Sequence, residues 1–286
     1  MQNELDIIKT SAGLTEGTKR TYTYTYKRMM ELLNFTPISN ISEKRVLKLI
    51  TESDIPVNSQ NGMLSVVILI RRHNDASVDL ILKYKDGKQR KLMAEDKKEK
   101  NIILEQTLPS YETYANYIDE LYKAKEWKSY IVNFLLFKYG VRNLDLDLII
   151  TRDKSVVSKI NNKNSEVNYM YITPSNKYVS WIRNKYKTVN SYGRKTISIT
   201  AKKFINAVNE FLQNDYFEKP LLDVGELSVG HTIRTMTYNQ IGEGGIYKML
   251  FAHHKSKGDI NALKKLSVSR GHDLSTAMGF YDISNT

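Results

Sequence analysis

Two short groups of polar residues in the second half of the chain have types and spacings that suit phosphate chemistry. Arg142 and Asp145 are three residues apart, so on a helix they share one face and the carboxylate can orient the guanidinium. His231 and Arg234 have the same spacing, and both side chains can donate hydrogen bonds to phosphate oxygens. Each pair alone is an ordinary helical pattern, so the two gain weight only when they are considered together.

A third group lies near the end of the chain, where Gly271-His272 is followed nine residues later by Tyr281. Because 19 of the 286 residues are tyrosine, this spacing alone decides little. The adjacent pair His253 and His254 is the alternative source of imidazole, but no tyrosine stands nine residues beyond either one. The sequence therefore favours His272 as the partner of Tyr281.

The composition favours a polyanionic partner. The chain has 43 basic and 31 acidic residues, which gives a net charge of +12, and it contains many tyrosines. Basic side chains displace counterions from phosphates and aromatic rings stack on bases, so the balance predicts binding to nucleic acid. The absence of cysteine excludes disulfides, thiolate zinc sites, iron–sulfur clusters and cysteine nucleophiles.

The sequence predicts no membrane span, metal site or organic cofactor. The longest nearly apolar run, residues 64–70, is far shorter than the roughly 20 residues that a spanning helix needs, and the N-terminus lacks a signal peptide's apolar core. Residues 242–245 are rich in glycine, but they lack the Gly-Lys-Ser/Thr of a phosphate loop and are typical of a loop that ends a helix. We expect a soluble, intracellular protein.

Residues 1–106 are expected to form a helical domain. Threonine or serine caps and apolar spacing predict helices that begin near Thr15 or Thr18 and after Ser42, and a third over residues 59–72. Residues 78–92 favour a fourth helix, although Asp86-Gly87 could instead turn a hairpin. The charged residues 95–100 fit either a linker or an exposed helix face.

Residues 107–286 are expected to form a second domain of mixed structure. Helices are predicted over residues 111–124, with Ser110 as N-cap, and over residues 127–139. Residues rich in β-branched and aromatic side chains predict strands at 169–172, 179–186 and 196–199. Further helices are expected over residues 201–212, 230–239, 246–251, 260–266 and after 275. The predicted fold class is mainly α with a small antiparallel β-sheet.

Taken in order, an arginine, a β-hairpin lysine, His-x-x-Arg, Gly-His and a terminal tyrosine resemble the tyrosine recombinases, or phage-integrase family. The resemblance covers roughly residues 107–286. It implies an N-terminal helical core-binding domain over residues 1–106, which binds DNA, and a catalytic domain over residues 107–286. It also implies a site-specific recombinase or integrase that cleaves and rejoins DNA.

The resemblance assigns roles to the residues at the matching positions. Tyr281 would attack the scissile phosphorus and form a 3′-phosphotyrosine, while Arg142 and Arg234 would hold the non-bridging oxygens. His231 and His272 would assist proton transfer. The family also uses a lysine that protonates the leaving oxygen. Lys187 is the first choice for this role, and Lys185, Arg194 and Lys195 are its rivals. Asp145 would be the supporting carboxylate. No metal or ATP is required.

Two alternatives share parts of this pattern. A type IB topoisomerase would use similar residues, but that family tends to carry a lysine where His231 stands. A DNA-binding relic of the recombinase family is disfavoured because every expected position is occupied. The stretch from Gly242 to Gly258 looks inserted relative to the family.

The expected partner is double-stranded DNA, and the expected assembly depends on it. Only five residues follow Tyr281, too few for the exchanged helix that commonly links family members. The positive charge also opposes self-association until DNA neutralises it. We therefore expect a monomer without DNA and self-association on DNA, from dimer to tetramer.

Overall fold

The structure is a computed structural model that describes residues 4–155, 167–186, 189, 193–213, 217–223, 228–271 and 273–281, with the backbone alone for residues 105 and 279–281. The chain divides into an N-terminal unit, Met1–Asn101, and a C-terminal unit, Ile102–Thr286. The division falls within helix α6 (Arg90–Thr107), as does the boundary expected from the sequence. Among the described residues, no helix is both long and apolar enough to span a membrane.

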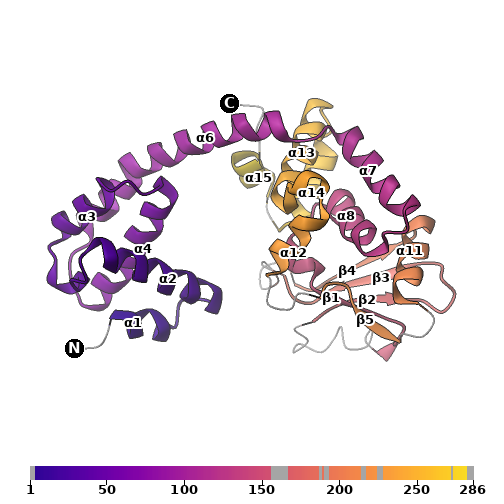
Figure 1. Cartoon of the computed structure of the whole chain (residues 1–286), viewed down its shortest axis with the longest axis horizontal. Coiled ribbons are helices and arrows are strands. Elements are labelled where there is room, and N and C mark those ends of the chain that lie inside the picture. The colour runs from indigo at the N-terminus through magenta and orange to yellow at the C-terminus, as the bar shows by residue number, and fades with distance from the viewer. Residues whose placement is uncertain are drawn as a thin grey trace. The chain divides into compact units, whose positions relative to one another are not determined.

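The N-terminal unit is helical (Figure 1). Its elements are α1 (Glu4–Thr10), α2 (Glu16–Leu32), η1 (Ile38–Asn40), α3 (Glu43–Thr51), α4 (Val57–His73), α5 (Asp79–Tyr84), the π-helical turn η2 (Lys85–Gln89) and the first part of α6. Thr15 and Ser42 accept hydrogen bonds from the backbone N–H of Thr18 and Arg45, which confirms both predicted caps. Asp86-Gly87 continues the helix instead of turning a hairpin, and residues 95–100 are helical.

Helix α4 supplies much of the core of this unit, because its apolar residues recur at helical spacing and are buried, among them Met63, Val67 and Ile70. The buried carboxylate of Glu4 joins α1 to the rest. It accepts hydrogen bonds from the backbone N–H of Ser39 at 2.8 Å and from the hydroxyl of Tyr26 at 3.1 Å. This pairing satisfies a charge that would otherwise be costly to bury.

The described residues of the C-terminal unit combine helices with one sheet. Its elements are α7 (Tyr111–Lys123), α8 (Trp127–Tyr139), η3 (Asn143–Leu146), β1 (Leu148–Thr151), β2 (Asn168–Ile172), β3 (Val179–Arg183), β4 (Lys195–Ile199), α11 (Lys202–Leu212), β5 (Glu218–Pro220), α12 (Val229–Met236), η5 (Tyr238–Gln240), α13 (Gly242–Ser256), α14 (Ile260–Ser269) and α15 (Leu274–Tyr281). Figure 1 shows the strands as one layer with α8 and α12 next to it. The prediction of a mainly helical fold with a small sheet is confirmed.

In the part of the chain that the structure describes, the strands form a five-stranded sheet in the order β4-β3-β2-β1-β5. Its neighbours are antiparallel except for β1 and β2, which run parallel, so the sheet is mixed and not purely antiparallel as predicted. Residues 152–167 separate these two strands, and a connection of that length permits the crossover that a parallel pair needs. Strands β1 and β5 were not predicted; β5 is only three residues long and ends in Pro220, a residue that is rare inside a sheet.

The glycine-rich residues 242–245 begin α13, so the prediction that they end a helix is wrong. Gly242 has a φ of +67°, which marks the turn into the helix. At Gly245, an added Cβ would lie 2.9 Å from the Cβ of Ile241 and 3.2 Å from a side-chain carbon of Leu108. Glycine is needed here for close packing at the start of a helix.

Candidate functional site

The segment that carries Arg142 begins where helix α8 ends. Gly140 closes α8 in the left-handed conformation, with a φ of +58°, and a Cβ at this position would lie 2.7 Å from the side chain of Leu266. Arg142 then precedes the 3₁₀ turn η3, and its backbone N–H donates to Asp145 Oδ2 at 2.8 Å. The carboxylate of Asp145 thus orients the backbone of Arg142, whose side chain is half-buried.

The other oxygen of Asp145 pairs with a buried arginine. Oδ1 lies 2.9 Å from Nη2 of Arg183, and each side chain is only 1% exposed. The guanidinium of Arg183 lies 4.7 Å from the ring centre of Tyr186 and 5.4 Å from that of Trp181. It also donates to the backbone carbonyl of Ser269 at 3.3 Å, at the end of α14. Arg183 therefore links β3 to both η3 and α14.

Helix α12 carries His231 and Arg234 one turn apart, and both side chains are exposed. Ser228 caps the helix by accepting from the backbone N–H of His231 at 3.2 Å. Arg234 Nε donates to the carbonyl of Gln240 at 2.9 Å, which leaves the guanidinium with further N–H donors.

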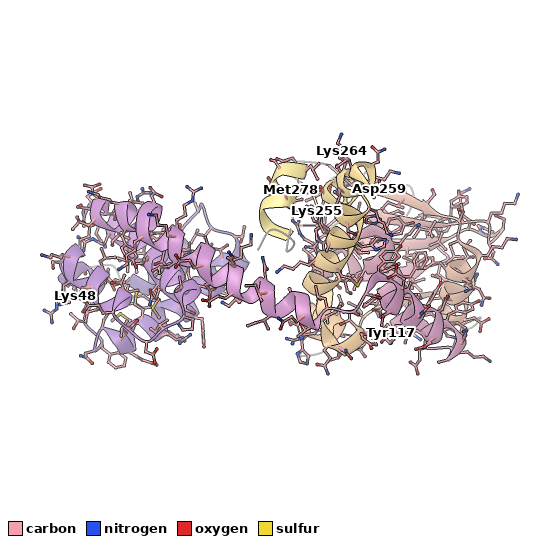
Figure 2. The ribbon with its side chains drawn as sticks, turned by 90° about the horizontal axis from the view of Figure 1, so that it is seen from above. Lys48, Tyr117, Lys255, Asp259, Lys264 and Met278 are labelled. Atoms are coloured by element: carbon pink, nitrogen blue, oxygen red, sulfur yellow. The ribbon has the colours of Figure 1, made fainter. Side chains whose placement is uncertain are left out.

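The C-terminal end of α12 is held by two helices that come earlier in the chain. The hydroxyl of Tyr117 in α7, labelled in Figure 2, donates to the carbonyl of Met236 at 3.0 Å. Nδ2 of Asn133 in α8 donates to the same oxygen at 2.8 Å. Because Asn133 is fully buried, this anchor fixes α12 against the core of the unit.

Helix α12 packs against η3, which brings together the first two groups singled out in the sequence. The contact is close: a Cβ on Gly230, the residue before His231, would lie 3.2 Å from Nδ2 of Asn143, the residue after Arg142. Glycine at position 230 therefore leaves room for the side chain of Asn143 against α12. The arrangement puts exposed donors of α12 beside the segment of Arg142.

Lys187 lies outside the described residues, but the start of its loop is described. Asn168, which is fully buried, accepts hydrogen bonds from the backbone N–H of Asn184 at 2.9 Å and of Lys185 at 2.8 Å. Its amide also donates to the carbonyl of Leu144 in η3 at 3.1 Å. One side chain thus joins the loop that carries Lys187 to the turn that follows Arg142.

Of the rival residues in the hairpin, Lys195 has the most constrained position. It pairs with Arg183 across β3 and β4, and its Nζ donates to the carbonyl of Val268 at 3.1 Å. Burial and, to a lesser extent, the charge of Arg183 lower the pKa of Lys195. Lys185 is exposed and Arg194 is half-buried. A lowered pKa eases release of a proton, so Lys195 stays a candidate for the general acid.

His272 and the side chain of Tyr281 lie outside the described residues, although α15 ends at Tyr281. The residue two positions before His272, Arg270, is buried and fixes the segment. Its Nε donates to the carbonyl of Gly140 at 3.0 Å, its guanidinium lies 4.0 Å from the ring centre of Tyr247, and it forms an ion pair with Glu243. The last group therefore follows a segment that is tied to the residues just before Arg142.

The alternative histidines serve packing contacts. The ring of His253 stacks on Tyr111 with 3.9 Å between centroids, and it meets the ring of His254 at 82°. Burial lowers the pKa of His254, and its Nδ1 lies 3.9 Å from Asp259. In the part of the chain that the structure describes, no three His, Asp or Glu side chains form a group that could hold a metal ion.

The N-terminal unit has a basic groove between α1 and α2, with a volume of about 370 Å³. We call it the α1–α2 groove. Its lining consists of Lys9, Glu16, Lys19, Arg20, Thr23, Tyr24 and Lys27. Glu16 pairs with Lys19 at 2.9 Å, and the ring of Tyr24 is 64% exposed. Cationic side chains can bind the phosphates of a nucleic acid, and an exposed aromatic ring can pack against its sugars or bases.

Sequence reasoning missed several residues that position this site, among them Arg183, Glu243 and Arg270. Each is an ordinary charged residue in the sequence, and its partner is remote along the chain. One signal was available for Arg183, since an arginine inside a run of β-branched and aromatic residues is buried if that run is a central strand. Glu243 carried no comparable signal.

Comparison with known proteins adds one similarity. No family model and no curated protein matches the chain. Among solved structures, the chain matches the crystal structure of XerA recombinase. The match covers 98% of this chain and 92% of the recombinase chain, with 13% sequence identity and a TM-score of 0.34. A similarity of this size does not establish a shared fold or function.

Proposed function

We propose that the protein is a site-specific DNA recombinase or integrase that cleaves and rejoins DNA through a 3′-phosphotyrosine intermediate. The observation that carries the proposal is the contact between η3 and α12, which are remote in sequence. It puts the segment of Arg142 beside the helix that bears His231 and Arg234. Two arginines on adjoining segments suit a phosphodiester, because both can hold its non-bridging oxygens.

In the proposed reaction, the hydroxyl oxygen of Tyr281 attacks the scissile phosphorus. A bond forms between that oxygen and phosphorus, and the bond from phosphorus to the 5′-oxygen breaks. The proton of the tyrosine passes to a base, for which His231 and His272 are the candidates. A second 5′-hydroxyl then reverses the exchange. One phosphoester replaces another in each step, so no ATP is consumed.

The charged residues stabilise the transition state and protonate the leaving group. Arg142 and Arg234 neutralise the charge that builds up on the equatorial oxygens, and their guanidinium groups keep that ability at any physiological pH. The leaving 5′-oxygen needs a proton, which we assign to Lys187, with Lys195 as the described alternative. Asp145 supports the site by holding the backbone of Arg142.

Double-stranded DNA is the proposed partner of both units. Residues 1–106 carry 18 basic and 14 acidic residues, and residues 107–286 carry 25 and 17, so each half is positive. The α1–α2 groove supplies a concave basic surface in the N-terminal unit. Contacts of this kind give affinity through the phosphates, and sequence selection then depends on contacts with base edges.

The test is covalent trapping on nicked DNA drawn from a random-sequence library. Cleavage next to the nick releases a short fragment, so the phosphotyrosine cannot be reversed and a protein–DNA adduct survives denaturing electrophoresis. We expect wild type and Tyr178→Phe to form the adduct and Tyr281→Phe to form none. Tyr178 is a matched control because it is an exposed tyrosine of the same unit.

Two results would contradict the proposal in different ways. An adduct formed by Tyr281→Phe would mean that another residue is the nucleophile. Failure of wild type to form any adduct across the library, with DNA binding intact, would favour a DNA-binding relic of the recombinase family.

A further inference from the structure

The two backbone N–H groups on either side of the Cα of Arg142 are each held by a carboxylate. The N–H of Arg142 donates to Asp145 at 2.8 Å, and the N–H of Asn143 donates to Glu243 Oε2 at 2.7 Å. Hydrogen bonds to ionised acceptors are among the strongest in proteins. Consecutive amides held in this way leave the backbone at Arg142 little freedom to rotate.

Each of these carboxylates is paired in turn with a buried arginine. Asp145 pairs with Arg183 at 2.9 Å, and Glu243 pairs with Arg270, whose side chain is 3% exposed. We call these two ion pairs the Asp145 brace and the Glu243 brace. Neither arginine faces solvent, so neither is placed to contact DNA directly.

The two arginines come from the segments that carry the other predicted catalytic residues. Arg183 ends β3, four residues before Lys187, and Arg270 lies two residues before His272. Both also donate to backbone carbonyls next to the site, Arg183 to Ser269 and Arg270 to Gly140. Each brace therefore connects the segment of Arg142 to a different part of the proposed active site.

We propose that Arg183 and Arg270 are positioning residues, which act through Asp145 and Glu243 to hold Arg142 in the geometry that cleavage of DNA requires. This inference rests on the proposed function. A displacement of about 1 Å in a group that contacts the reacting atoms lowers rates about 100-fold, so loss of a brace should slow cleavage without weakening DNA binding.

The experiment compares two scissile linkages in the nicked substrate. An ordinary phosphodiester needs its negative charge neutralised, whereas a methylphosphonate replaces one charged oxygen by a methyl group and has less need of Arg142. The variants are Arg142→Ala, Arg183→Met and Glu243→Gln, and cleavage rates are measured in single turnover at saturating DNA. Glu243→Gln removes only a charge from a side chain that is 16% exposed, so it tests the idea even if Arg183→Met folds poorly.

We expect Arg183→Met and Glu243→Gln to lower the cleavage rate on the phosphodiester by about 100-fold. On the methylphosphonate, each deficit should shrink to within about 10-fold, with the same selectivity that Arg142→Ala shows. Dissociation constants for DNA should stay unchanged. A general loss of folding would reduce cleavage of both linkages alike, which separates positioning from stability.

Two control variants remove comparable contacts elsewhere. Lys203→Met breaks the exposed ion pair with Asp119, and Arg71→Met removes a buried guanidinium that donates to the carbonyls of Ser77 and Ile41 in the N-terminal unit. Both should cleave at the wild-type rate once DNA is saturating. Their melting temperatures show how much destabilisation alone affects the assay.

The outcomes distinguish the inference from the function on which it rests. If wild type forms no adduct on the phosphodiester, the proposed function fails. If wild type does form it and the brace variants show equal deficits on both linkages, or none on either, the positioning roles of Arg183 and Arg270 are refuted.

Discussion

The buried ion pair between Asp145 and Arg183 leads to a prediction about the free energy of unfolding, which can be tested without any assay of activity. Both side chains are 1% exposed, and Oδ1 of Asp145 and Nε of Arg183 have no aligned hydrogen bond among the described residues. The pair is therefore held mainly by its opposite charges. Removing one member leaves the other charged and buried, which costs about 3–5 kcal/mol. Removing both charges while keeping similar volumes is often close to neutral.

Two single variants and the double variant test this difference between removing one charge and removing both. Asp145→Asn keeps an amide oxygen that can accept from the N–H of Arg142, and Arg183→Met keeps an apolar chain between Trp181 and Tyr186. Each single variant should lose about 3–5 kcal/mol of unfolding free energy. The double variant should lose about 1 kcal/mol, which gives a coupling energy well above that of a surface pair.

Urea unfolding followed by tryptophan fluorescence provides the assay. The chain's two tryptophans, Trp127 and Trp181, both lie in the C-terminal unit, so the signal reports on that unit alone. With a denaturant slope of about 2 kcal/mol per molar urea, each single variant should shift the midpoint down by about 2 M. If the double variant instead shows the sum of the two single shifts, the two charges are not coupled and the reasoning is refuted.

Three further predictions concern the general acid, the N-terminal unit and pH. If Lys187 protonates the leaving oxygen, Lys187→Ala should be slow on ordinary DNA and rescued by a 5′-bridging phosphorothiolate, because sulfur leaves without a proton; selective rescue of Lys195→Ala would move the role there. Replacing Arg20 and Lys27 of the α1–α2 groove by alanine should weaken DNA binding and reduce the slope of log affinity against log salt by about 0.9 per lost phosphate contact. Burial and a nearby carboxylate raise the pKa of Tyr26 to about 12, so its contribution to stability is present below pH 10 and is lost as pH rises from 10 to 12.

Each of these has a direct measurement. Equal loss of cleavage on both substrates would assign Lys187 to phosphate binding. An unchanged salt slope, measured between about 50 and 200 mM salt, would exclude the α1–α2 groove from the DNA interface. The phenolate absorbance of wild type minus Tyr26→Phe should titrate near pH 12, and a midpoint near pH 10 would contradict the burial argument.

Local signals in the sequence predict most of the helices, because a cap and an apolar face act within a few residues. Ser42 and Ser110 begin helices as expected, and each accepts from the backbone N–H three residues on. The hairpin of β3 and β4 is also local, since residues 184–194 connect its strands. The three groups of candidate catalytic residues could be recognised in the sequence for the same reason, because each group spans only a few positions.

The contacts that hold the site together depend on partners remote in sequence, which no local pattern reveals. Glu243 pairs with Arg270 and with the N–H of Asn143, and these three positions lie in α13, at the end of α14 and in η3. The parallel pairing of β1 with β2 has the same origin, because it depends on a crossover and not on a turn. The glycines around Glu243 suggested a loop, since the sequence does not show that Gly245 is packed closely against Leu108 and Ile241.

The two arginines proposed to hold the phosphate are positioned by different means. Arg142 follows a glycine-closed helix and lies on a backbone fixed by two carboxylates, each paired with a buried arginine. Arg234 is exposed on α12, and its Nε donates to one carbonyl at the protein surface, that of Gln240. A fixed group needs little reorganisation when substrate binds, whereas an exposed side chain loses rotamer freedom at that moment. We therefore expect cleavage to be sensitive to buried substitutions behind Arg142, while substitutions around Arg234 should change chiefly the affinity for DNA.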